Sequence, residues 1–167
     1  ILSDAKNTSP NNLTACVLER PRHDQIVDAL NSMGVKINFI TDGDVSGVIS
    51  VADPNMENDI YLGIGGGPEG VLAAAALKCM GCQMQTRLLF YDKDEENRAK
   101  KLGLKNLNKK YNIQDMVKGD VIFCATGVTD GDIVKGIKDL GNNFETETFV
   151  LHKNSNTNKK IKNIIKK

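Results

Sequence analysis

The sequence predicts an α/β fold in which a layered, mainly parallel sheet is flanked by helices. Three observations support this prediction. Short apolar, β-branched runs alternate along the chain with segments that have an apolar helical face. The 167 residues suffice for one domain with a substantial core. Polar or glycine-rich segments follow four of the apolar runs, and such loops converge at the carboxyl edge of a parallel sheet, where ligands bind.

The expected strands are short, and several end at a polar or glycine-rich turn. They cover residues 13–18, 35–40, 60–62, 85–91, 119–125 and 144–151. One more strand, over 159–165, is expected to pair with the last of these as a hairpin across residues 154–158.

The expected helices have recognisable start and stop signals. They cover residues 24–33, 45–52, 71–78, 93–102 and 133–137. Pro21 suits the first turn of the first helix and Gly34 its end, whereas Pro54 stops the second. The third consists of strong helix formers. The fourth has acidic residues early and lysines late, which suits the helix dipole.

The overall charge and the cysteines exclude several classes of protein. The 22 basic and 21 acidic residues nearly cancel, so neither nucleic-acid nor membrane binding is indicated. No long apolar run predicts a membrane span and no signal peptide is evident. Cys16 and Cys124 lie in apolar strand-like runs, which is typical of reduced, buried thiols in a cytosolic protein, so a cytoplasmic location is expected. The C-x-x-C of Cys79 and Cys82 closes a predicted helix and has no second cysteine pair, which favours two structural thiols over a zinc or redox site.

The glycine-rich loop between residues 63 and 70 is the strongest single motif. Its five glycines allow a ligand to approach the backbone, and the amides of the following helix suit an oxyanion. Glu69 would repel a phosphate unless a cation lay between them, so the loop predicts a phosphate bound together with a metal ion. The loop also matches the dinucleotide pattern G-x-G-x-x-G with Asp92 downstream, although Glu69 and Pro68 argue against that alternative.

Two other loops carry charged candidates. Arg20 and Arg22 could bind a phosphate through several charge-assisted hydrogen bonds, or they could be surface arginines at a helix start. Asp42 and Asp44 could bind a metal or sugar hydroxyls, although one of them could be a helix N-cap. His23 is a lone histidine, for which a structural role is the more common one, and no nucleophilic triad is supported.

Four segments together resemble the class II fructose-1,6-bisphosphatases in order and spacing. They are Leu18–His23, Asp42–Val45, Gly63–Val71 with its alanine-rich helix, and Ala125–Asp132. The resemblance extends from about residue 13 almost to the end of the chain. It implies a fold related to the inositol-phosphatase group of sugar phosphatases. It also implies metal-dependent hydrolysis of fructose-1,6-bisphosphate to fructose-6-phosphate in gluconeogenesis, with sedoheptulose-1,7-bisphosphate as a substrate of some members.

The resemblance also implies a role for each matching residue. Arg20, Pro21 and Arg22 would bind the phosphate that is not cleaved. Asp42, Gly43 and Asp44 would hold sugar hydroxyls, and Gly66 would lie against the substrate. Glu69 would be a ligand of Mn²⁺ or Mg²⁺ beside the phosphate that is cleaved. The expected partner is therefore a small sugar bisphosphate, and a homo-oligomer is expected.

The sequence departs from the family pattern in two places. Gly67 stands where many members have Thr or Ala. The family's Asp-Pro-x-Glu-Gly-Thr motif, which holds metals, is missing, and the string Asp53–Glu57 has the wrong spacing to replace it. Residues 1–167 are therefore interpreted as a C-terminal substrate-binding domain without its N-terminal metal-binding half, and are expected to be inactive alone. The alternative is a complete, non-catalytic module that binds a sugar phosphate or a dinucleotide.

Overall fold

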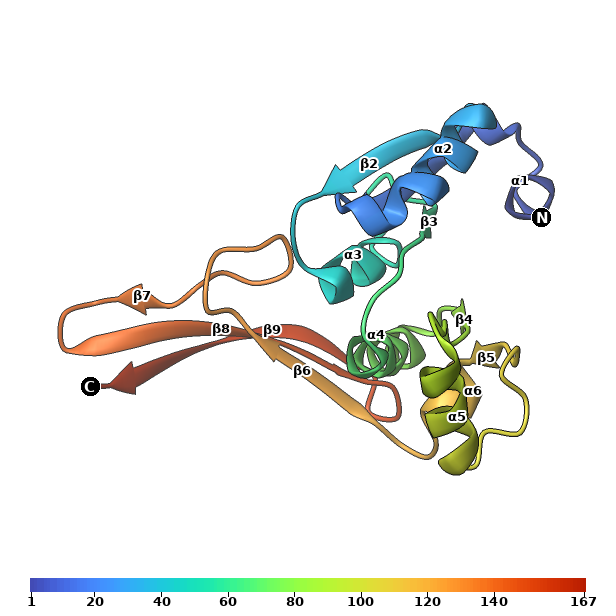
Figure 1. Cartoon of the computed structure of the whole chain (residues 1–167). Coiled ribbons are helices and arrows are strands. Elements are labelled where there is room, and N and C mark those ends of the chain that lie inside the picture. The colour runs from blue at the N-terminus through green and yellow to red at the C-terminus, as the bar shows by residue number, and fades with distance from the viewer.

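The computed structural model describes residues 1–167, apart from the side chain of Asp44. Figure 1 shows a sheet with its flanking helices on one side of the molecule and a long β-hairpin on the other, with a central helix between them. The helices are α1 (Leu2–Ala5), α2 (Asp24–Ser32), α3 (Asp44–Ser50), α4 (Gly67–Met80), α5 (Lys93–Lys101), α6 (Ile113–Met116) and the 3₁₀ turns η1 (Pro10–Asn12) and η2 (Pro21–His23). The strands are β1 (Thr14–Leu18), β2 (Lys36–Ile40), β3 (Ile60–Tyr61), β4 (Gln85–Thr86), β5 (Tyr111–Asn112), β6 (Ile122–Thr126), β7 (Lys138–Asp139), β8 (Asn143–His152) and β9 (Thr157–Lys166).

The N-terminal part of the chain forms the predicted parallel sheet, with strand order β2-β1-β3. The central strand, β1, has four buried residues in succession, as a strand covered on both faces requires. On one face, Ala15 and Val17 pack with Leu30 of α2. Cys16, on the other face, lies close enough to Ser50 of α3 to bond it, and burial raises the pKa of this thiol. The polar loops after β1, β2 and β3 therefore emerge at one edge.

The C-terminal part forms a second sheet, which is antiparallel, so the expectation of a mainly parallel sheet is wrong there. One edge of β8 pairs with β9 along its whole length, and its other edge pairs with β6 and β7. A parallel connection from β6 would need a crossover of a dozen or more residues, usually a helix. The segment between β6 and β8 instead contains four glycines, at positions 127, 131, 136 and 141. Each would destabilise a helix interior by about 1 kcal/mol, so an irregular loop forms.

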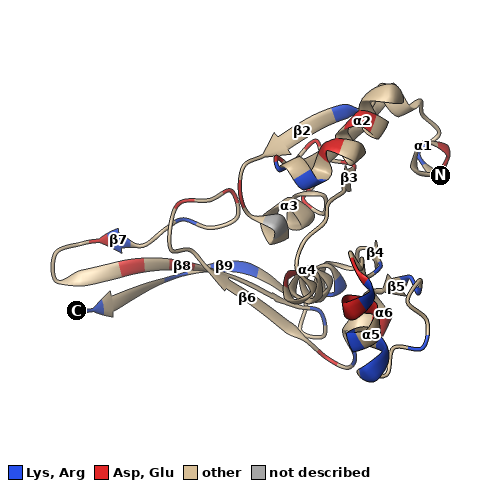
Figure 2. Ribbon diagram, viewed as in Figure 1, with Lys and Arg blue, Asp and Glu red and all other residues tan. Residues whose placement is uncertain are grey.

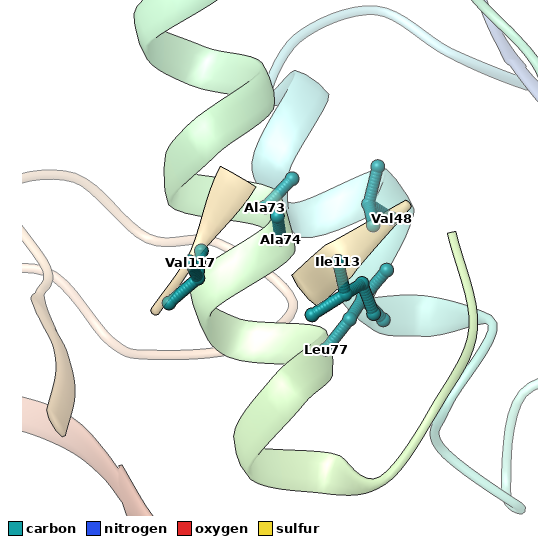
Figure 3. Close-up of a cluster of buried hydrophobic side chains, with 6 residues drawn as sticks. All are labelled: Val48, Ala73, Ala74, Leu77, Ile113 and Val117. Atoms are coloured by element: carbon teal, nitrogen blue, oxygen red, sulfur yellow. The ribbon is translucent and has the colours of Figure 1, made fainter. Parts of the chain in front are cut away.

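Helix α4 lies between the two sheets and joins their cores. It is apolar on all sides, and Ala74 and Ala76 are fully buried. Figure 3 shows one cluster, in which Ala73, Ala74 and Leu77 of α4 meet Val48 of α3 and residues of the α6 segment. On another side, Ala76 packs with Phe123, Phe149 and Leu151 of the antiparallel sheet. The small alanine side chains allow this close approach, and the N-terminus of α4 is thereby fixed.

Two local predictions are wrong for identifiable reasons. The strand expected over 85–91 ends at Thr86, because its partner β5 offers only two residues. The helix expected over 133–137 does not form; the chain folds back instead, with Gly131 N donating to Val134 O and Ile137 N to Val128 O. Ile133 and Val134 nevertheless pack against the core cluster around Phe149. Their apolar character therefore predicted their packing against the core correctly, but it did not predict their secondary structure.

Substitution of Gly127 should destabilise the loop that follows β6. A Cβ on Gly127 would lie 2.1 Å from the carbonyl oxygen of Lys135, a main-chain atom that cannot rotate away. We expect Gly127→Ala to lower the free energy of unfolding by about 1–3 kcal/mol, measured by urea denaturation. Gly131→Ala is the matched control, since its Cβ would meet Val134 O at an ordinary 3.7 Å. Equal stability of the two variants would contradict the loop geometry.

The carboxylate of Asp59 should make stability depend on pH. Burial alone would raise the pKa of Asp59, but hydrogen bonds from Lys6 and the Thr14 amide, with the charge of Lys6, lower it overall. A lowered pKa in the folded state stabilises the fold above the unfolded value of about 3.9, and this contribution is lost as pH falls through the folded pKa. Asp59→Asn should therefore be less stable than the parent at pH 7, and the difference in urea midpoint should shrink in acid. Asp28→Asn, at an exposed position of α2, should show no such difference.

Candidate functional site

The predicted site residues gather around the carboxyl edge of the parallel sheet. Main-chain hydrogen bonds fix the start of the loops there: Glu19 N donates to Ile40 O at 2.8 Å, and Leu62 N donates to Cys16 O at 3.1 Å. The first bond joins the exits of β1 and β2, and the second joins β3 to β1. Three of the four loops that the sequence singled out are thus adjacent, as predicted.

Arg20 connects the exits of β1 and β2. Its two terminal nitrogens donate to Glu19 O at 2.7 Å and to Thr41 O at 2.8 Å. Pro21 begins the 3₁₀ turn η2, which closes when His23 N donates to Arg20 O. The guanidinium of Arg20 is exposed and lies beside the loop that contains Asp42. Its positive charge is therefore held at the sheet edge by main-chain contacts.

Arg22 connects the arginine turn (Arg20–Arg22) to the glycine loop (Gly63–Gly70). Its Nε donates to Ile64 O at 2.6 Å, across 42 positions of the sequence. The next residue, His23, is 1% exposed, and its ring contacts Leu18 O and both main-chain groups of Ile64. From the sequence, anion binding is predicted for each of the two segments separately. Only the structure shows that they are in direct contact.

Asp42 and Gly43 form the turn between β2 and α3. Asp42 is exposed, and its Oδ1 accepts a hydrogen bond from Gly43 N at 2.8 Å. Gly43 has φ +85° and is the N-cap residue of α3, so the neighbouring aspartates are not that cap. A side chain at Gly43 would also clash with Ser46 Oγ, 2.3 Å from its built Cβ. The side chain of Asp44, predicted as a second sugar-binding carboxylate, lies outside the described part.

The glycine loop leads directly into α4 at Gly67. Gly70 N donates to Gly66 O as the first helical bond, so the amides of Gly67 and Glu69 have no acceptor within the helix. Glu69 is exposed, and its carboxylate folds back over Gly66. Its Oε2 lies so close that a Cβ added to Gly66 would be only 2.1 Å from it. Amide donors and one carboxylate thus share the start of a 14-residue helix. This arrangement suits an anion and a cation side by side.

A metal ion at Glu69 would need more ligands than this carboxylate provides. Mg²⁺ takes six oxygen ligands as a rule, commonly one or two carboxylates with phosphate and water. Among the side chains that the structure describes, no three histidine, cysteine, aspartate or glutamate residues gather into a metal-binding group. Glu69 therefore fits the role of one ligand in a set that phosphate and other groups complete.

The fourth loop of the sequence prediction, after β6, borders a cleft of about 1230 Å³. Thr129, Asp130 and Lys135 line it from this loop, opposite the end of β2. Glu147 of β8 anchors the loop, since its carboxylate accepts from Lys135 N and its carbonyl from Gly127 N. Of the predicted site residues that the structure describes, only Asp42 and Gly43 line the cleft. The arginine turn and the glycine loop lie outside it, so the position of the cleft alone does not identify the predicted phosphate-binding residues.

The charged residues of the chain are spread over several elements and do not concentrate at the candidate site. Figure 2 shows acidic and basic residues mixed on α5 and separate basic positions on β9. Asp92, the acidic residue of the dinucleotide alternative, caps α5 by accepting from Glu95 N at 2.8 Å. It does not end a strand of the parallel sheet, which removes the layout that a dinucleotide site requires. In the described structure, no helix has the length and apolar character to cross a bilayer.

Comparisons with known proteins agree with the arrangement of the loops. A family model described as bacterial fructose-1,6-bisphosphatase, glpX-encoded, matches residues 1–165. The class 2 fructose-1,6-bisphosphatase of Haemophilus influenzae is 40% identical over 170 residues, which cover 93% of this chain and 51% of that protein. The class 2 fructose-1,6-bisphosphatase/sedoheptulose-1,7-bisphosphatase of Synechococcus sp. strain JA-3-3Ab is 33% identical over 171 residues, which cover 94% of this chain and 49% of that protein. The chain thus spans about half the length of the curated relatives it matches.

Proposed function

Because the chain belongs to the bacterial, glpX-encoded fructose-1,6-bisphosphatase family, we propose that it is part of a phosphoric monoester hydrolase for sugar bisphosphates. The proposed reaction converts fructose-1,6-bisphosphate and water to fructose-6-phosphate and phosphate, as a step of gluconeogenesis. Sedoheptulose-1,7-bisphosphate is the second proposed substrate, since one class of relatives carries both names. The single observation that carries the proposal is the hydrogen bond from Arg22 Nε to Ile64 O, which joins the arginine turn to the glycine loop.

In this proposal the two segments bind the two phosphates of one substrate. Arg20, Pro21 and Arg22 bind the phosphate that stays on the sugar, through charge-assisted hydrogen bonds. The amides at the start of α4 receive the phosphate that is cleaved, with Gly66 against the substrate. Asp42, Gly43 and Asp44 accept hydrogen bonds from the sugar hydroxyls between them. The resemblance to the fold of the inositol-phosphatase group is part of the same proposal.

We further propose that Glu69 binds Mn²⁺ or Mg²⁺ together with the phosphate that is cleaved. A divalent ion there would neutralise charge on the reacting phosphoryl group and lower the pKa of a bound water. The remaining ligands and the groups that position the water are assigned to an N-terminal half of a longer polypeptide, in line with the length of the relatives. The expected homo-oligomer and cytoplasmic location stay predictions.

Phosphate release from fructose-1,6-bisphosphate tests the proposed function. The assay compares this chain with a polypeptide extended to the length of the relatives, each with Mn²⁺, with Mg²⁺ and with chelator. Uncatalysed phosphate-ester hydrolysis is extremely slow, so binding residues alone should give no measurable turnover. The extended polypeptide should release phosphate only with metal. Metal-dependent turnover by the short chain would contradict the half-enzyme proposal, and inactivity of the extended polypeptide would contradict the activity.

Arg22→Ala in the extended polypeptide should raise KM for fructose-1,6-bisphosphate about tenfold or more, because a lost charge-assisted bond is worth about 1.5–3 kcal/mol. The effect on kcat should be smaller, since a phosphate remote from the reaction contributes mainly uniform binding. Arg98→Ala, which removes an exposed arginine of α5, is the matched control and should leave KM unchanged. An unchanged KM in the Arg22 variant would remove this residue from the substrate site.

A further inference from the structure

His23 is a polar side chain with an unusual position for a residue next to an exposed arginine. It is 1% exposed and is one of the largest fully buried side chains of the molecule. It lies at the end of the arginine turn, yet its ring reaches Ile64 in the glycine loop, 41 positions away. A buried polar group is retained without penalty only when its hydrogen bonds are satisfied. The partners of the ring therefore define what it does.

The two ring nitrogens have partners whose roles cannot be exchanged. Nδ1 lies 2.6 Å from Leu18 O, and a carbonyl oxygen can only accept, so Nδ1 carries the proton. Nε2 lies 2.8 Å from Ile64 N, and this amide can only donate, so Nε2 is the acceptor. The longer approach of Nε2 to Ile64 O, 3.1 Å, is therefore not a hydrogen bond in this tautomer. The two shorter contacts indicate the tautomer with its proton on Nδ1.

Ile64 is held at both of its main-chain groups by two consecutive residues. His23 accepts from its amide, and Arg22 donates to its carbonyl through Nε at 2.6 Å. His23 also joins Ile64 to the end of β1 through Leu18 O. Ile64 precedes Gly66 by two positions and Glu69 by five. Ile64 is thus a direct link between the arginine turn and the segment that leads into α4.

We propose that His23 is a positioning residue that fixes the spacing between two phosphate subsites, one at the arginine turn and one at the glycine loop. The proposal rests on the proposed function, since it takes the two segments as the two ends of one bisphosphate site. The spacing between the subsites affects only a ligand that occupies both of them. For such a ligand, a displacement of one subsite by about 1 Å can remove most of the benefit of preorganisation. A ligand with a single phosphate, bound at the arginine turn alone, does not depend on it.

The test compares binding of fructose-1,6-bisphosphate and fructose-6-phosphate to this chain by calorimetry with Mg²⁺ present, since the chain alone is expected not to hydrolyse the bisphosphate. His23→Asn keeps an amide that can donate to Leu18 O but is too short to reach Ile64. It should lower the affinity for the bisphosphate about tenfold and leave that for the monophosphate unchanged. His23→Gln places an amide oxygen near the position of Nε2 and should restore most of the preference. Retention of the full preference by His23→Asn would overturn the proposal, as would an equal loss of affinity for both ligands, which indicates a merely structural role.

Two measurements without ligand keep the proposal separate from the proposed function. In the parent chain, ¹⁵N spectra of the ring should show a protonated Nδ1 and an unprotonated Nε2. Hydrogen exchange of the Ile64 amide should be slow in the parent and in His23→Gln, and faster in His23→Asn. A proton on Nε2 in the parent chain would overturn the positioning role even if either variant failed to fold. Equal protection of Ile64 in the three folded proteins would overturn it as well. Absence of any preference for the bisphosphate in the parent chain would instead contradict the two-phosphate site itself.

Discussion

Glu69→Gln in the extended polypeptide is expected to lower metal-dependent phosphate release at saturating fructose-1,6-bisphosphate by a factor on the order of 10²–10³. Glutamine preserves the size of the side chain and removes the charge that a divalent cation requires. Glu69 is exposed at the start of α4, so its replacement leaves the core clusters of α4 untouched. The loss should therefore appear in kcat and in the apparent affinity for Mn²⁺ or Mg²⁺, with the melting temperature nearly unchanged.

The control for this result is Glu57→Gln. Glu57 is an exposed glutamate in the string Asp53–Glu57, whose spacing does not match a metal-binding motif. Its replacement should leave phosphate release and metal affinity unchanged. If Glu69→Gln lowered kcat but the same metal concentration still gave half-maximal activity, Glu69 would act on the substrate and not on the cation.

Gly66→Ala is expected to lower kcat/KM about 100-fold without destabilising the fold, the largest effect that we expect from one added methyl group. The new Cβ would lie 2.1 Å from Glu69 Oε2. Because this oxygen is the far end of a flexible side chain, the carboxylate can swing away at little cost in stability. The cation proposed to bind Glu69 would then lose this ligand while the helix stays intact.

Gly67→Ala separates this effect from a general intolerance of the glycine loop. A Cβ on Gly67 has no heavy atom within 4 Å, and alanine is a better helix former than glycine at the first position of α4. This variant should be as active as the parent and slightly more stable. Equal losses in both variants would mean that the loop needs glycine for ligand approach throughout. A change in KM without a change in metal affinity in Gly66→Ala would mean that the methyl group clashes with substrate.

The sequence alone predicts the part of the fold that is dictated by local patterns. The unbroken apolar run of β1, the face of α2 and the alanine-rich α4 were each identified, because their periodicity and boundaries are local properties. The direction of β6 was not predictable in this way. An apolar run looks the same in a parallel and in an antiparallel sheet, and the choice depended on the glycine-rich loop after it.

The candidate site shows the same division between local and long-range information. Convergence of the loops after β1, β2 and β3 follows from the parallel topology, so Arg22 and the glycine loop could be placed at one edge. The contact itself could not, because a hydrogen bond between residues 22 and 64 leaves no periodic signal. From the sequence, a structural role was favoured for His23, because no nucleophile or second histidine could be placed beside it. Its place at the end of the Leu18–His23 segment, directly after Arg22, was a hint in the sequence that it lies beside the predicted site.

The two sheets differ in how their outer edges would behave when the chain is concentrated in solution. The outer edge of β9 carries Lys159, Lys160, Lys162 and Lys166, and clustered lysines oppose pairing with a strand of another molecule. β2 is the terminal strand of the parallel sheet, and it has one lysine at its start, followed by Ile37, Phe39 and Ile40. Phe39 is 47% exposed there, with no second lysine on the strand, whereas the exposed Ile164 and Ile165 of β9 share their strand with four lysines. Self-association of the isolated chain is therefore expected to begin at the free edge of β2. The chain should stay monodisperse at low protein concentration, or when another molecule covers this edge.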